Sequence, residues 1–413
     1  MTLLDPTPPT TSPWPRAAPD GARRLLAADG PTREEHLARF GALPDATETG
    51  DLVDLLERSG LRGRGGAGFP SARKLRSVAE SGRGVVVANA AEGEPLSEKD
   101  RTLLAVAPHL VLDGLALAAR AVGARRAYLV TARADTARDV RAQLQRRRDA
   151  VPVSVLQVED RFLSGEESAV VNAVNGRPGL PSDRSVRVYE RGVNRRPTLL
   201  HNVETLAHVA LLARFGPEWF GSVGTTDEPG TFLATVSGAV RSPGVREVAF
   251  GSTIGDLVTS AGAVDRPQAV LLGGYHGAWV PGRVAAGTRL TRSALAPYGA
   301  SVGAGVVGVL GRDRCGLVES AAIVAYLAGQ VAGQCGPCVN GLPQMADALG
   351  RLAAGQRDPR LVEEVERMRS LVAGRGACAH PDGTVRFVAS TLSVFSGEIA
   401  VHLGGGCSVP APR

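Results

Sequence analysis

The chain has 413 residues, too many for one ordinary core, and this length predicts two to four packed units. Its longest apolar runs stop well short of twenty residues, so we expect no transmembrane segment. The Pro- and Thr-rich start lacks the apolar region of a signal peptide, and five unevenly spaced cysteines do not form a disulfide framework. We therefore expect an intracellular, cytoplasmic protein.

The net charge of +6 does not predict a nucleic-acid partner. The arginines are scattered among acidic residues instead of forming a basic stripe with aromatic platforms. Only Lys74 and Lys99 are lysines. In a chain that otherwise uses arginine, we expect these two where a flexible ammonium suits a site better than a planar guanidinium.

Strands alternate with helices in the first half of the chain. Residues 1–30 show no hydrophobic period and are predicted to form a disordered N-terminal extension. The alternation over 31–227 favours an α/β domain with a mainly parallel sheet. The predicted elements are a helix over 52–58 ending at Gly60, a helix from Ser71, a strand over 84–88, a helix over 103–122, a strand over 127–131, a helix over 134–146, a strand over 153–158 and a helix from Glu166.

The composition then changes twice. Residues 228–300 are predicted to form a small β-grasp-like module, and residues 310–405 a helical domain. The module contains a hairpin over 231–250, a helix over 253–261 and a strand over 269–273; the later helices cover 318–330, 341–354, 359–373 and 384–403.

A glycine-rich loop precedes the helix predicted from Ser71. Four glycines within residues 63–68 allow backbone N–H groups to converge on an anion. Arg62, Arg64 and Lys74 add positive charge, which favours a phosphate-bearing ligand; a tight turn that needs glycine is the alternative. The dinucleotide fingerprint requires a preceding strand, whereas residues 52–58 have a helical pattern.

Two acidic loops follow predicted strands. Residues 89–95 (Asn-Ala-Ala-Glu-Gly-Glu-Pro) and 165–168 (Gly-Glu-Glu-Ser) lie where open α/β sheets bind ligands. Asn89 can hydrogen-bond a heterocycle, and the glutamates can bind ribose hydroxyls or position a nicotinamide. A solvated loop and a helix N-terminus are the corresponding structural alternatives.

The cysteines suggest a metal or cluster site. Cys335 and Cys338 are two residues apart at a helix start, and Cys378 follows forty positions later. Buried thiols or a redox pair are the alternatives, although no strand precedes the pair. The nearest candidates for a fourth ligand are His380, Cys315 and Cys407.

Together these segments resemble the flavoprotein subunit of NADH-quinone oxidoreductase, respiratory complex I, and the chain looks like a divergent member of that family. The segments at 61–70, 89–95, 165–168 and 202–206 occur in the family's order, and the likeness extends over about residues 35–405. Diaphorase subunits of NAD-linked hydrogenases and formate dehydrogenases are relatives. The resemblance implies a Rossmann-like FMN and NADH domain, a β-grasp module of the soluble-ligand-binding type and a helical bundle holding an iron–sulfur cluster.

The resemblance also implies roles for individual residues. Glu94 and Glu167 match positions near the nicotinamide and are the candidate catalytic residues, while Phe69 matches an aromatic that stacks on NADH. The cluster ligands are Cys335, Cys338 and Cys378. The positions that match FMN-binding residues are Gly63, Arg64, Gly65, Gly66, Lys74, Asn89, Glu92, Gly165, Glu166, Asn202 and Thr205.

Several positions depart from the family pattern. Ala91 replaces an aspartate, Leu75 replaces an aromatic, and His201 replaces an asparagine. Residues 183–197 lack a second NADH-stacking ring, and Ala332 aligns with the family's first cluster cysteine. Three thiolates imply a [4Fe–4S] cluster with a non-cysteine fourth ligand, or a [3Fe–4S] cluster.

Two functions follow. In the first, hydride passes from NAD(P)H to FMN, and single electrons leave through the cluster to a ferredoxin-like or thioredoxin-like [2Fe–2S] protein. In the second, the chain is a degenerate electron-relay or docking subunit that no longer oxidises NADH. The electron acceptor, the choice between NADH and NADPH, and membership of a complex peripheral to a membrane stay open.

Overall fold

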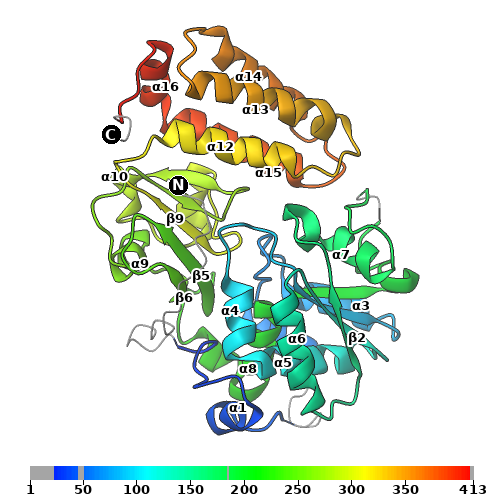
Figure 1. Ribbon diagram of the computed structural model, residues 1–413. Helices are drawn as coiled ribbons and strands as arrows, with labels where there is room; N and C mark the ends of the chain where they lie inside the picture. The colour runs from blue at the N-terminus through cyan, green and yellow to red at the C-terminus, as the bar shows by residue number, and fades with distance from the viewer. Residues whose placement is uncertain (1–22, 45–50, 184–185, 410–413) are drawn as a thin grey trace.

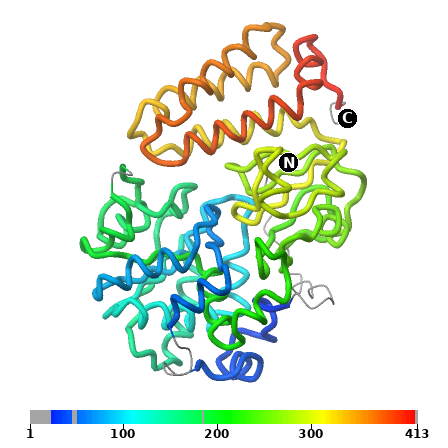
Figure 2. Tube along the Cα trace, turned by 180° about the vertical axis from the view of Figure 1, so that it is seen from behind, coloured from blue at the N-terminus to red at the C-terminus, as the bar shows by residue number. Residues whose placement is uncertain are grey.

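The computed structural model describes residues 23–44, 51–183 and 186–409. Figure 1 shows a lobe built on a parallel sheet at the lower right, a second sheet at the left, and a layer of helices across the top. The view from behind in Figure 2 shows the same three regions stacked in the same order. The molecule is thus an α/β protein with a parallel sheet, a mixed sheet and a C-terminal helical region.

The first lobe is a four-stranded parallel sheet with strand order β3-β2-β1-β4. Parallel strands place all their carboxyl ends at one edge, and the loops with sequence motifs follow β1 and β4 there. The strands are β1 (Val85–Ala90), β2 (Ala127–Thr131), β3 (Val153–Gln157) and β4 (Thr198–Asn202). The helices are α1 (Arg33–Phe40), α2 (Leu52–Ser59), α3 (Ser71–Ala79), α4 (Lys99–Val106), α5 (Pro108–Ala121), α6 (Ala134–Gln145), α7 (Glu167–Val174) and α8 (Val203–Gly221).

The predicted helix over 103–122 is instead two helices, α4 and α5, bent by 97°. Pro108 opens α5, because a proline ring lacks the N–H that would continue the preceding helix. The second helix, α5, packs against α8 behind the sheet.

The second sheet is mixed, with strand order β6-β5-β9-β7-β8. Its central strand β9 (Val306–Leu310) runs parallel to β5 and antiparallel to β7, so the predicted module boundary at residue 300 was too early. Only the pairing with two distant strands reveals that this short apolar run belongs to the sheet. The other elements are β5 (Thr231–Gly238), β6 (Gly244–Ala249), α9 (Ile254–Ser260), β7 (Ala269–Leu272), β8 (Ala278–Pro281), α10 (Gly282–Ala285) and α11 (Arg292–Leu295).

The helical region begins with α12 (Gly316–Gly329). The predicted helix over 384–403 starts earlier and breaks at Phe395, where the chain bends by 76°. The remaining helices are α13 (Leu342–Ala353), α14 (Arg360–Val372), α15 (His380–Val394) and α16 (Ser396–Leu403).

The prediction of a disordered extension over 1–30 was wrong for residues 23–30; residues 1–22 lie outside the described residues. Leu25 is fully buried in the core of the first lobe. The backbone N–H groups of Arg24, Leu25 and Leu26 donate to the carboxylate of Glu247 on β6. A partner more than two hundred positions away orders this segment, and local composition cannot reveal it.

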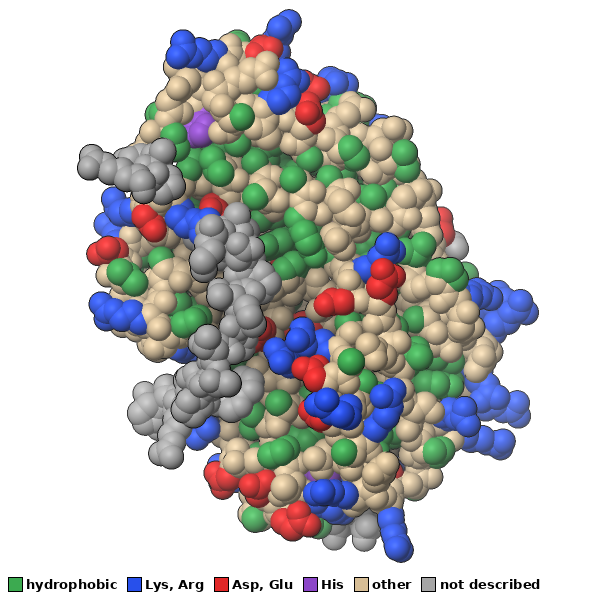
Figure 3. All heavy atoms as spheres, in the orientation of Figure 1, with side chains coloured by type: hydrophobic (Ala, Val, Ile, Leu, Met, Phe, Trp, Pro, Cys, Tyr) green, Lys and Arg blue, Asp and Glu red, His purple; other side chains and the backbone are tan. Residues whose placement is uncertain are grey.

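In the described part of the chain, no single helix is both long and apolar enough to cross a membrane, although the bent pairs α4–α5 and α15–α16 each meet that test together. On the face shown in Figure 3, basic side chains lie scattered with acidic ones among them, and hydrophobic side chains gather below the helical region.

Candidate functional site

A cavity of about 420 Å³ lies at the carboxyl edge of the parallel sheet, within the size range of small-molecule and cofactor sites. The mixed sheet contributes Gly273 and His276 to its wall, and the helical region contributes Ala379, His380 and Arg386. All three regions therefore meet around one site. The predicted site residues that line it are Gly65, Gly66, Asn89, Glu92, Glu94, Gly165, Glu166 and Asn202.

The glycine loop carries a buried cation. The backbone N–H of Arg64 donates to Thr205 Oγ1 at 2.9 Å, and its guanidinium lies 4.6 Å from the centroid of the Phe250 ring. Burial lowers the pKa of Arg64 to about 10, so the group stays charged at neutral pH. Its Nε and Nη2 atoms are buried without a hydrogen-bond partner among the described residues. Together with Gly63 and Gly66 they face a small cavity, where unpaired donors suit an anion such as a phosphate.

The two acidic loops, residues 89–95 and 165–168, are in close contact at the cavity. Asn89 Nδ2 donates to the carbonyl oxygen of Gly165 at 2.9 Å. A Cβ atom at Gly165 would lie 2.3 Å from the carbonyl oxygen of Ala91, a distance that no side chain tolerates. Gly165 is therefore required for the approach of the two loops that form this wall.

Two half-buried carboxyl groups line the cavity with raised pKa values. Burial raises the pKa of Glu94 to about 8, although its Oε2 accepts a 2.8 Å hydrogen bond from the backbone N–H of Tyr275. Burial and the nearby Asp100 raise the pKa of Glu92 to about 7. Glu92 also accepts from the hydroxyl of Ser97 at 2.5 Å. Near neutral pH each carboxyl can therefore hold or release a proton inside the cavity.

Lys99 joins several of these motifs. Its ammonium is buried and donates to Asp100 at 2.6 Å, to Asn202 at 3.0 Å and to Glu204 at 2.9 Å. Burial opposes its charge, but Asp100 and Glu204 outweigh that effect and raise the pKa of Lys99. Glu204 also accepts from the backbone N–H of Leu233 on β5, so the network links the two sheets.

The remaining predicted residues of the first lobe lie outside the cavity wall. Lys74 forms an ion pair with Glu167 and donates to the carbonyl oxygen of Leu200 at 2.9 Å. Phe69 is 42% exposed beside the glycine loop, with the Arg73 guanidinium 5.6 Å from its ring centroid. These residues form the margin of the site, where a second ligand could stack or pair.

Three cysteines meet at one end of the helical region. Cys335 and Cys338 lie within side-chain hydrogen-bond reach of each other, and Cys338 is close enough to Cys378 to interact electrostatically. Burial raises the pKa of Cys338 to about 12. Burial also opposes ionisation of Cys335, but backbone N–H groups, that of Ala377 first, outweigh it and lower its pKa. The three thiols fit the ligand set of an iron–sulfur cluster.

His380 lines the cavity and follows Cys378 by two residues. Its Nδ1 pairs with His276 at 3.0 Å, and its Nε2 with the carbonyl oxygen of Leu327 at 2.9 Å. As a fourth cluster ligand it would have to give up one of these bonds. Phe162 packs against both rings, with its centroid 4.6 Å from that of His276. His276 and Phe162 were not predicted, because neither lies in a sequence motif and only the fold brings them together.

Two protein-family models match the parts of the chain that form this site. The profile of the Nuo51 FMN-binding domain matches residues 56–211, and that of the NADH-ubiquinone oxidoreductase-F iron-sulfur binding region matches residues 318–402. The two matched regions contain the glycine loop and the cysteines, respectively. The chain belongs to the family of the NADH-quinone oxidoreductase flavoprotein. The family is one of NADH-oxidising oxidoreductases, and the two matched parts of this chain are its FMN-binding and 4Fe-4S-binding regions.

Individual relatives show how far it has diverged. It is 29% identical to the NADH-quinone oxidoreductase F subunit 2 of Rhizobium meliloti, over 86% of this chain and 89% of the relative. It is also 29% identical to the F subunit of Salmonella typhimurium, over 87% and 85%. Among solved structures, an air-oxidized NAD+-reducing [NiFe]-hydrogenase superposes with a TM-score of 0.82 and 29% identity. That match covers 89% of this chain and 66% of the hydrogenase chain.

Proposed function

We propose that the chain takes hydride from NAD(P)H on bound FMN and passes single electrons through an iron–sulfur cluster to a protein acceptor. One observation carries this proposal: the cavity wall includes Ala379 and His380, which directly follow Cys378. A flavin in this cavity and a cluster on the three cysteines would therefore be neighbours. Electrons could pass between them without any rearrangement of the fold.

The chain's own residues prepare the site. Arg64 and the glycine loop hold the phosphate end of FMN, and Asn89, Gly165 and Asn202 enclose its ring. Glu94 holds a proton at its carboxyl group, in a cavity whose wall also includes residues of the mixed-sheet region and of α15. Phe69 stacks on the nicotinamide nucleotide at the margin, and Glu167, held by its ion pair with Lys74, positions it. Bound FMN supplies the exchange between hydride and single electrons.

We infer a Rossmann-like domain up to residue 227 and a β-grasp module of the soluble-ligand-binding type that extends to residue 310 with β9. The hairpin β5–β6, the crossing helix α9 and the parallel pair β5–β9 support this assignment. The acceptor we expect is a thioredoxin-like or ferredoxin-like [2Fe–2S] protein in a larger cytoplasmic complex. This expectation is supported by the relatives from Rhizobium meliloti and Salmonella typhimurium, which are both subunits of an NADH-quinone oxidoreductase.

A relay or docking subunit without NADH oxidation is the second candidate. Ala91 lies directly in the acidic loop where the family pattern has an aspartate, and Leu75, which takes the place of an aromatic, is buried in the core. Phe69 is then the sole exposed ring next to the glycine loop within the described residues. Weak nicotinamide binding would leave the cluster to be reduced by another protein.

An anaerobic visible spectrum of the purified chain, before and after one equivalent of NADH, tests the proposal. We expect flavin bands that bleach on NADH addition, together with a broad iron–sulfur shoulder that decreases. A flavin spectrum unchanged by both NADH and NADPH would favour the relay subunit. A protein that retains no flavin after reconstitution with FMN would overturn the proposed hydride transfer.

A further inference from the structure

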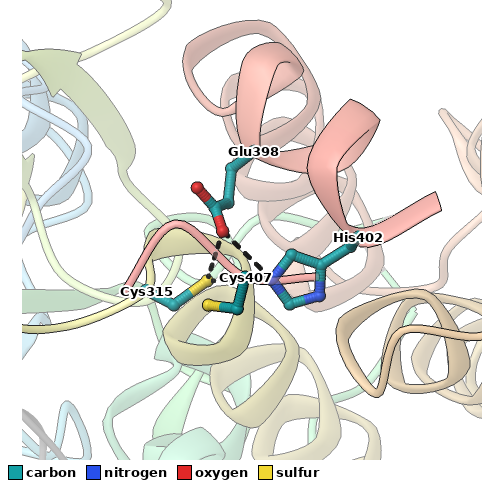
Figure 4. A group of neighbouring side chains, drawn as sticks. All are labelled: Cys315, Glu398, His402 and Cys407. Atoms are coloured by element: carbon teal, nitrogen blue, oxygen red, sulfur yellow. Dashed lines mark hydrogen bonds and ion pairs between the residues drawn. The ribbon is translucent and has the colours of Figure 1, made fainter. Parts of the chain in front are cut away.

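A second group of metal-ligating side chains lies away from the cavity. Cys315 precedes α12, Glu398 and His402 lie one turn apart on α16, and Cys407 follows that helix. Figure 4 shows the four side chains pointing toward one another. One donor atom from each lies within 4.8 Å of the others.

The spacing of these atoms matches ligands on a single ion. Cys315 Sγ lies 3.4 Å from His402 Nε2 and 3.6 Å from Glu398 Oε1, and the last two atoms are 3.1 Å apart. Tetrahedral zinc with ordinary bond lengths separates a sulfur from a nitrogen or oxygen by about 3.6 Å, and a nitrogen from an oxygen by about 3.4 Å. The backbone is thus already arranged for one metal ion, and only small side-chain adjustments are needed.

Two of the four side chains, those of Cys315 and His402, are buried. His402 is 3% exposed, and its Nδ1 has no partner within the described chain. Its Nε2 faces Cys315 and Glu398, so the tautomer with the proton on Nδ1 directs the Nε2 lone pair at the group. Glu398 is fixed by the backbone N–H of Ser408 at 2.9 Å. Cys407 is exposed and leaves a path by which an ion can enter.

We propose that Cys315, Glu398, His402 and Cys407 bind one structural zinc ion. Two thiolates, an imidazole and a carboxylate are a ligand set that zinc accepts, and four protein ligands leave no open position for catalysis. Binding displaces the two thiol protons to solvent and changes no oxidation state. The ion would fasten α16 and the C-terminal segment to the start of α12, where the chain leaves the mixed sheet.

This site is separate from the cluster cysteines. Cys315 lies before the first residue of α12, whereas Cys335 and Cys338 follow its last residue. The helix has 14 residues and is therefore about 20 Å long. One cluster cannot span that distance. Cys315 and Cys407, which the sequence offered as candidates for the fourth cluster ligand, therefore do not bind the cluster.

Elemental analysis of the full chain, expressed without a metal-binding tag and purified under reducing conditions with zinc in the growth medium, tests the proposal. We expect about one zinc per chain in the wild type and about a tenfold loss in the double variant Cys315→Ser/Cys407→Ser, with iron retained. Cys407→Ser alone alters an exposed residue and keeps the test valid where the double variant does not fold. The matched control Cys335→Ser should lose iron and keep zinc.

Cobalt substitution adds a readout of the ligands themselves. Co²⁺ in place of zinc should give the intense visible and thiolate charge-transfer bands of a tetrahedral sulfur site, and Cys407→Ser should weaken the charge-transfer band. Reduced wild-type protein without zinc, or zinc content unchanged in both serine variants, would overturn the proposal. A loss of iron together with zinc in Cys407→Ser would instead assign these thiols to the cluster.

Discussion

The parallel-sheet lobe and the helical region are held together by different chemistry. Around the cavity, the buried ammonium of Lys99 pairs with the carboxyl groups of Asp100 and Glu204 and joins the motif loops. In the helical region, cysteine side chains bring distant segments together. Three cysteines lie beyond the last residue of α12, and the group that contains Cys315 and His402 lies at its first residue. The charge network contains all of its own partners, whereas the sulfur groups are completed by metal. We therefore expect the cavity to form without cofactors and the helical region to depend on them.

The largest effect should come from Lys99→Met. Removal of a buried ammonium leaves Asp100 and Glu204 without compensation, which costs about 3–5 kcal/mol of unfolding free energy. Lys74→Met is a matched control, because its ion pair with Glu167 is partly exposed and contributes only about 0–1 kcal/mol. Denaturant unfolding of both variants measures the difference. Equal losses would show that the network around Lys99 does not hold the lobe together.

The cluster should be the next most sensitive part. Cys338→Ser removes a buried thiol from a set of three, and we expect most of the iron to be lost with FMN retained. Iron and flavin analysis of the same preparation measures both. Iron content unchanged in this variant would contradict the cluster assignment. In the wild type, an EPR signal from the oxidised protein would identify a [3Fe–4S] cluster, whereas an oxidised [4Fe–4S] cluster is silent.

The pH dependence of NADH oxidation should follow Glu94. With a pKa of about 8, its carboxyl group is mainly neutral at pH 7 and mainly anionic at pH 9. Because the anion repels the negatively charged dinucleotide, we expect kcat/KM for NADH to fall about tenfold over that range. Glu94→Gln can still accept from the Tyr275 N–H and should flatten the profile.

Stability gives a second readout of the same group. The pKa of Glu94 is higher in the folded chain than in the unfolded one, so its neutral form favours folding at low pH, and that contribution is lost as pH rises through about 8. Tm should therefore fall with pH more steeply in the wild type than in Glu94→Gln. Parallel curves for the two proteins would place the titrating group elsewhere.

The sequence predicted what lies in short contiguous segments. The strand over 127–131, the helix that ends at Gly60 and the two acidic loops needed only local patterns. Features formed by segments far apart in the sequence were not predicted. The local sequence around β9 does not indicate which strand it pairs with, and that around Leu25 does not indicate the carboxylate it binds. The rarity of lysine pointed to Lys99, but its partners Asn202 and Glu204 became visible only in the fold.

The smallest effect should come from Phe69→Ala. Loss of one stacking ring costs about 1 kcal/mol, which raises KM for NADH about fivefold and leaves kcat unchanged. Phe215 is a matched control, because it is 40% exposed on α8 and packs against Trp219 instead of lying beside the glycine loop. Phe215→Ala should leave KM unchanged. A KM that Phe69→Ala does not alter would mean that the nicotinamide nucleotide is held inside the cavity, where Phe162 and His276 become its aromatic neighbours. The recognition of NADH would then depend on residues from all three regions of the fold.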